Sequence, residues 1–173
     1  MKYCLKIQAV CIPQKAEQYF NGEYVEDTDP SPDFMQVEAL DGFFKSRNWV
    51  TYRTELSIFH KCYKLAGQAD LLCRDESGGI VIVDWKRCRE IKYENRWMSM
   101  KPPLHHLPET NYWTYALQLN LYLLMLEEEM GFSVSGMYLV CVHPERSAPL
   151  ILEVPRMTTE IDSLRPMLQE LNR

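Results

Sequence analysis

Two acidic residues and a lysine near the middle of the chain have types and a spacing that suit phosphate chemistry. Asp70 follows Gly67-Gln68-Ala69, and Asp84-Trp85-Lys86 follows the aliphatic run Ile80-Val81-Ile82-Val83. Two carboxylates held close together repel each other unless a cation lies between them, so the pair suits a divalent-metal site. Lys86 would share a strand face with Asp84 and place an ammonium group beside the metal.

The turn between these two segments predicts how they align. Glu76-Ser77-Gly78-Gly79 is typical of a turn between two strands. If Ser77 is the centre of a three-residue hairpin loop, antiparallel partners have numbers that sum to 154, so Asp70 lies opposite Asp84. Glu55 lies on the preceding predicted strand and adds a third carboxylate. A single acid at a strand end is often structural, and the combination is what favours a site.

The elements that must position these residues follow from the spacing of apolar residues. In chain order, the pattern predicts a helix over 34–45, strands over 49–59, 64–74 and 80–86, a helix over 111–130, strands over 137–142 and 150–154, and a helix over 158–171. Residues 1–12 fit either a strand or a short helix, 12–33 read as an acidic loop, and 87–110 as a basic loop interrupted by three prolines. We expect one domain over 1–173, with its core over about 35–155.

The predicted basic loop combines cations with aromatic side chains. Lys86, the last residue of the preceding strand, begins a run of cations that continues in the loop with Arg87, Arg89, Lys92, Arg96 and Lys101. The aromatic residues Trp85, Tyr93 and Trp97 are interleaved with them. Cations that contact phosphates and rings that stack on bases suit a single nucleic-acid strand, whereas the alternative is an ordinary solvated loop. The formal net charge of −5 argues against nonspecific coating of nucleic acid, so any affinity must be local.

With these motifs in place, the sequence resembles the PD-(D/E)XK nuclease superfamily, particularly its RecB-like exonuclease branch. The resemblance covers about residues 35–145. It lies in Glu55, Gly67-Gln68-Ala69-Asp70, Asp84-Trp85-Lys86 and Gln118-Leu119-Asn120-Leu121-Tyr122, the last similar to a Q-x3-Y motif. The fold that it implies is α/β (α+β): a mixed central sheet flanked by helices, with the restriction-endonuclease-like αβββαβ core.

The resemblance also implies roles for individual residues. Asp70, Asp84, the backbone carbonyl of Trp85 and Glu55 would hold one or two Mg²⁺ or Mn²⁺ ions. Lys86 would position and help deprotonate the attacking water, or stabilise charge on phosphorus, which makes Asp70, Asp84 and Lys86 the expected catalytic residues. The expected substrate-binding residues are Gln118, Tyr122, Arg87, Arg89, Lys92 and Arg96.

One family feature is missing from the sequence. Many RecB-like members carry a metal-binding histidine on an N-terminal helix, and residues 1–50 contain none. Glu38 and Glu55 are the candidates to replace it. Gln118 and Tyr122, four residues apart on an apolar helix, also have a structural interpretation, in which both side chains only support the core.

The expected function is a metal-dependent nuclease that hydrolyses DNA phosphodiester bonds at single strands or strand ends. The alternatives are an RNA-cleaving endonuclease of cap-snatching type and an inert nucleic-acid-binding or assembly domain of the same fold. DNA is favoured over RNA as the partner, and the chain could be part of a larger replication or repair protein. Exonuclease or endonuclease action, polarity and oligomeric state stay open.

The cysteines and the apolar stretches exclude other classes. The six cysteines are scattered singly without a CxxC pair, so we expect neither disulfides nor an iron-sulfur cluster. No stretch is long and apolar enough to predict a membrane span, and no secretion signal is recognisable at Met1. We therefore expect an intracellular protein without a membrane partner.

Overall fold

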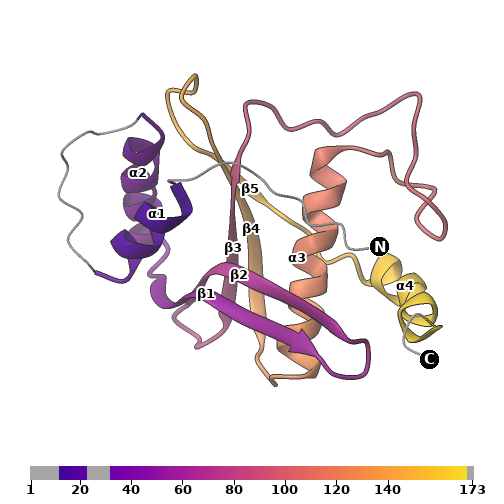
Figure 1. The fold of residues 1–173 in the computed structure, drawn as a ribbon. Coiled ribbons are helices and arrows are strands. Elements are labelled where there is room, and N and C mark those ends of the chain that lie inside the picture. The colour runs from indigo at the N-terminus through magenta and orange to yellow at the C-terminus, as the bar shows by residue number, and fades with distance from the viewer. Residues whose placement is uncertain (1–11, 23–31, 171–173) are drawn as a thin grey trace.

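A computed structural model describes residues 12–22 and 32–170. A five-stranded mixed sheet lies between helices (Figure 1). The elements are α1 (Ile12–Phe20), α2 (Pro32–Ser46), β1 (Val50–His60), β2 (Leu65–Arg74), β3 (Ile80–Arg87), α3 (Asn111–Glu128), β4 (Val134–Val142), β5 (Leu150–Glu153) and α4 (Thr158–Glu170). The fold is the α/β, restriction-endonuclease-like arrangement that the resemblance implies. Within the described residues, no helix has the length and apolar character needed to cross a bilayer.

The strands lie in the order β1-β2-β3-β4-β5. Neighbours are antiparallel except for β3 and β4, which run parallel and are connected through α3. The β2–β3 pairs run from Leu71↔Val83 to Arg74↔Ile80, so their numbers sum to 154 as predicted. In the turn between these strands, Asp75 accepts hydrogen bonds from the backbone N–H groups of Ser77 and Gly79, at 2.9 and 2.8 Å.

The sheet has a hydrophobic core on each face. On one face, Val83 and Trp85 of β3 pack against α1 and α2, including Leu40 and Phe44. On the other face, Ile82 belongs to the core that α3 covers. Side chains alternate along β3, so Asp84 and Lys86 share the α3 face with Ile82. Figure 1 shows α1 and α2 on one side of the sheet and α3 on the other.

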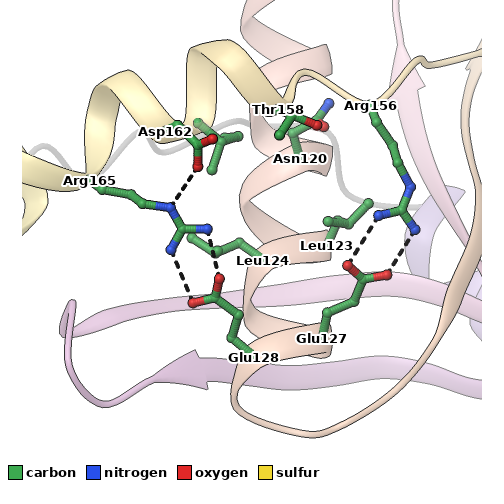
Figure 2. A pocket seen from close by; sticks show the side chains of 10 residues that line it. Asn120, Leu123, Leu124, Glu127, Glu128, Arg156, Thr158, Asp162 and Arg165 are labelled. Carbon is green, nitrogen blue, oxygen red and sulfur yellow. Dashed lines mark hydrogen bonds and ion pairs between the residues drawn. The ribbon is translucent and has the colours of Figure 1, made fainter.

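Ion pairs join α4, and Arg156 just before it, to the outer side of α3 (Figure 2). Arg165 binds Glu128 and Asp162, and Arg156 binds Glu127 through two of its nitrogens. These side chains line a pocket of about 130 Å³, and its arginines and glutamates are engaged with one another. This pocket is therefore a structural joint between two helices.

The first helix corrects one prediction. Residues 12–33 were expected to form an acidic loop, yet α1 occupies 12–20. Ala16 is fully buried, and the Phe20 ring stacks on the Trp85 ring with 5.6 Å between centroids. Burial of Ala16, Tyr19 and Phe20 against the sheet stabilises this helix, in which residues 14, 15, 17 and 18 are polar. The expectations for residues 1–11 and 23–31 lie outside the described residues.

Residues 88–110, called the arm below, form an irregular but anchored segment. They contain no helix or strand, only an isolated bridge between Ser99 and Pro108. Asn111, at the start of α3, accepts from the backbone N–H of Lys92 at 2.8 Å and donates to the carbonyl of Glu90 at 2.9 Å. Trp113 donates to the Tyr93 carbonyl at 3.1 Å. The loop was predicted, whereas its attachment to α3 was not.

Candidate active site

The buried end of β3 carries an acid and a lysine in direct contact. Asp84 is 1% exposed, and its Oδ2 lies 2.5 Å from Nζ of Lys86. The Lys86 ammonium group is therefore the partner of this buried oxygen among the described residues. A buried carboxylate oxygen in this state can still accept a cation.

Asp70 lies one residue beyond the last bonded pair of the β2–β3 ladder, Leu71↔Val83. The same register continued would oppose it to Asp84, as the sequence predicted. Its Oδ2 accepts a hydrogen bond from the Trp85 backbone N–H at 2.8 Å. Burial, followed by the charge of Asp84, raises the pKa of Asp70 to about 7. Negative charge is thus concentrated where two strands begin to separate.

Lys86 neutralises only part of this charge. Burial raises the pKa of Asp84, and the nearby ammonium group opposes that rise without cancelling it. Burial lowers the pKa of Lys86, but the carboxylates of Asp84 and Asp70 outweigh burial and raise it. The lysine is therefore cationic at neutral pH in this arrangement. That state suits charge stabilisation better than removal of a proton from water.

Glu55, the third predicted carboxylate, lies on β1 across the strand pair from Asp70. The pairs Thr54↔Leu71 and Leu56↔Ala69 place it across from Asp70, but its φ of 47° interrupts the extended strand. Its charge contributes to the raised pKa of Asp70, and its own pKa is raised by burial and by Glu17. Within residues 12–22 and 32–170, no three His, Cys, Asp or Glu side chains are grouped as metal ligands.

The structure does not group Glu38, the other candidate to replace the family's metal-binding histidine, with the two aspartates. Glu38 is an exposed residue of α2 and belongs to no ligand group among the described residues. The carboxylates that the structure brings together are therefore those of Asp70 and Asp84, and the Trp85 backbone lies beside them.

One face of α3 forms the wall opposite these carboxylates. Gln118 donates through Nε2 to the Tyr122 hydroxyl at 2.6 Å. Burial raises the pKa of Tyr122, and the charges of Asp84 and Asp70 add to that effect. The ring of Tyr115 lies 5.1 Å from Nζ of Lys86, measured to its centroid. Both predicted α3 residues therefore border the site.

Sequence reasoning missed Tyr115 as a neighbour of the lysine. It is three residues before Gln118 and seven before Tyr122, a spacing that puts all three on one helical face. That spacing was the available signal.

The predicted basic residues lie outside this buried cluster. Arg87, Arg89, Lys92 and Arg96 are exposed. Arg89 pairs with Glu145 at 3.1 Å, and Lys92 lies 4.0 Å from Glu90. The Trp97 side chain on the arm is 92% exposed, which is unusual for so large an apolar residue. These residues form a separate surface that begins where β3 ends.

The residues at the buried cluster fit a hard divalent cation. Their donors are oxygen atoms, and two carboxylates share the site with a single ammonium group. A dication would balance the excess negative charge that raises the pKa of Asp70.

Comparison with protein families decides the assignment. A sequence model described as the PD-(D/E)XK nuclease superfamily matches residues 13–173. The chain belongs to this superfamily. The PD-(D/E)XK match includes both aspartates, the lysine and the α3 residues described above.

Individual relatives are more distant. The chain is similar to the CRISPR-associated exonuclease Cas4 of Saccharolobus solfataricus, with 27% identity over 117 residues. This match covers 68% of the chain and 47% of that protein, so the chain spans about half the length of the curated relative.

Two solved structures are looser matches. A protein described as a candidate exonuclease from Eubacterium rectale has 11% identity and a TM-score of 0.48, covering 91% of this chain and 62% of that one. The protein SSO0001 has 18% identity and a TM-score of 0.40, covering 93% of this chain and 84% of that one. Both TM-scores are below 0.5, so the assignment of this PD-(D/E)XK protein does not depend on either structure.

Proposed function

We propose that this chain is a metal-dependent nuclease that hydrolyses phosphodiester bonds of DNA at single strands or strand ends. The observation that carries the proposal is the pair of buried acids Asp70 and Asp84 beside a single lysine, Lys86. One ammonium group does not balance two buried carboxylates, so the pair favours a further cation, and a phosphodiester brings more negative charge to the same point.

Each residue of the cluster would have a distinct task. Asp70, Asp84 and the Trp85 carbonyl would hold Mg²⁺ or Mn²⁺. The bound ion would polarise the phosphodiester and lower the pKa of its water. Lys86 would stay protonated and stabilise charge that develops on the phosphoryl oxygens. Gln118 and Tyr122 would contact the bound nucleic acid.

The arm would supply the affinity that the acidic protein as a whole lacks. Its cations, including Lys92 and Arg96, are exposed beside the exposed ring of Trp97. Phosphates would contact the cations while a base stacks on the ring. Replacing Arg89, Lys92 and Arg96 together by Glu should weaken binding and reduce the log-affinity against log-salt slope by about 0.7 for each lost phosphate contact. An unchanged slope and affinity would move the binding surface elsewhere.

A cleavage assay tests the proposed activity. End-labelled single- and double-stranded DNA and RNA are incubated with the protein in Mg²⁺, Mn²⁺ or EDTA. We expect metal-dependent cleavage of single-stranded DNA that is lost in Asp84→Ala. The matched control is Asp41→Ala, which removes an acid of α2 whose partner, the exposed Lys45, lies 2.6 Å away.

Other outcomes of this assay would contradict the proposal. Preferential cleavage of RNA would indicate a ribonuclease, and binding without cleavage in either metal would indicate an inert nucleic-acid-binding domain. A folded Asp84→Ala variant that cleaves at the parental rate would show that the metal site is wrongly placed. Thermal melting establishes whether each variant is folded.

A further inference from the structure

A groove lies beside the candidate active site, between the start of β2 and α3. Its volume is about 400 Å³. Leu65, Ala66 and Gly67 line it from β2, Leu121 lines it from α3, and Met100 of the arm also contributes. None of the residues that line this groove carries a charge. Its chemistry therefore differs sharply from that of the carboxylate cluster next to it.

Tyr122 connects the groove with the carboxylate cluster. It lines the groove, and the charges of Asp84, Lys86 and Asp70 all act on its hydroxyl. Gly67 allows this position, because a Cβ atom there would lie only 2.6 Å from Cε1 of the tyrosine. The groove therefore borders, through Tyr122, the place where the scissile phosphate would lie.

The polar side chains of the groove are one carboxamide, that of Gln118, and two hydroxyls, those of Tyr122 and Thr114. The Thr114 hydroxyl already donates to the Thr110 carbonyl at 2.9 Å. Gln118 uses one Nε2 hydrogen to bond the Tyr122 hydroxyl. Its second Nε2 hydrogen and its Oε1 are a donor and an acceptor side by side, which is the pattern that the edge of a nucleobase complements. Small-ligand pockets typically have volumes of roughly 300–1,000 Å³, so this groove suits one nucleoside unit rather than a stack of bases.

We propose that this groove holds the unpaired base of the nucleotide next to the phosphate that is cleaved. The proposal rests on the proposed nuclease function and adds a binding site for the base beside the site for the phosphate. Charged residues and the metal take the phosphate, while an uncharged groove takes the base and sugar. A base in a duplex is stacked and paired, so entry requires a single strand or a frayed end. The groove is therefore a physical source of preference for single strands.

Filling the groove tests this assignment. Ala66 is exposed on β2, so Ala66→Trp should place an indole in the groove without disturbing the core. Thr114→Trp fills it from α3 and is the second variant should the first fail to fold. Val50→Trp is the matched control, because Val50 is 68% exposed on β1 and does not line the groove.

Two readouts separate this inference from the proposed function. The first is the ratio of oligonucleotide cleavage to hydrolysis of bis(p-nitrophenyl) phosphate, a small diester without a base. We expect this ratio to fall at least tenfold in Ala66→Trp and to stay constant in Val50→Trp. The second is the fluorescence of a single-stranded oligonucleotide containing 2-aminopurine, bound in EDTA, which should change with the parent protein and not with Ala66→Trp.

The outcomes are distinct. A parental ratio and fluorescence response in folded Ala66→Trp and Thr114→Trp would overturn the base-binding groove while leaving the nuclease proposal intact. A parent that binds the probe with a fluorescence change but cleaves no nucleic acid would support the groove and overturn the nuclease function.

Discussion

Replacing Asp70 by Asn should stabilise the metal-free protein, although it removes a proposed metal ligand. The pKa of Asp70 is about 7 in the folded chain against 3.8 for an ordinary Asp, because of burial and the charge of Asp84. A tenfold change in a proton-binding constant corresponds to about 1.4 kcal/mol, so ionised Asp70 costs at most about 4 kcal/mol above pH 7. An Asn side chain carries no charge, and its oxygen can still accept from the Trp85 N–H.

The sign of the pH dependence follows from the same pKa. Between about pH 4 and pH 7 the folded chain retains a proton on Asp70 that the unfolded chain has lost. The parent therefore loses stability as pH rises through this window, and Asp70→Asn does not. The advantage of the variant should be close to zero at pH 4 and greatest at pH 8.

Thermal melting in EDTA at pH 4 and pH 8 measures this difference. In a protein of this length about 3 °C accompanies each kcal/mol, so Tm should rise by about 12 °C at most at pH 8. Mn²⁺ should raise the Tm of the parent more than that of Asp70→Asn. The control is Asp75→Asn, whose effect should have the opposite sign, because hydrogen bonds from Ser135, Ser77 and Gly79 lower the pKa of Asp75 to about 2. A variant less stable than the parent at pH 8, or equally stabilised at both pH values, would refute the reasoning.

Three further substitutions test other parts of the site. Lys86→Ala should retain Mn²⁺ binding by calorimetry yet lose on the order of 10²-fold in cleavage rate, and an unchanged rate would exclude a catalytic role for the lysine. Gly67→Ala should lower the unfolding free energy by about 1–3 kcal/mol in denaturant titrations, since its Cβ would lie 2.6 Å from the Tyr122 ring, and parental stability would show that the ring can move away. Trp97→Ala should leave Tm unchanged and weaken single-strand affinity by about 1–3 kcal/mol in an anisotropy titration. Equal affinity would mean that no base stacks on this side chain.

The sequence predicted the strands of the site well because local chemistry determines them. The glycine-rich turn after Asp75 fixed the β2–β3 register, and that register brought Asp70 and Asp84 to the same end of the sheet. Alternation along β3 then placed Lys86 beside Asp84. The contact on α3 between Gln118 and Tyr122 agreed with their four-residue spacing.

Other features depend on contacts between distant segments, which the sequence does not display. The positive φ of Glu55 removes it from regular strand geometry, and no neighbouring residue signals such a conformation. Helix α1 depends on the apolar contacts of Phe20 with Phe44 and Trp85, which come from two other elements. The attachment of the arm depends on Asn111, whose amide bonds two backbone groups about twenty residues earlier.

The irregular course of β1 also affects how separate copies of the protein behave at high concentration. Among the described strands β1 is at one edge of the sheet, and such an edge can pair with a strand of another molecule. A register shift between Thr51 and Arg53, followed by the left-handed backbone of Glu55, interrupts the row of free N–H and C=O groups. Replacing Glu55 by a β-branched residue would favour a different backbone there, so self-association through this edge should accompany any loss of activity in such variants.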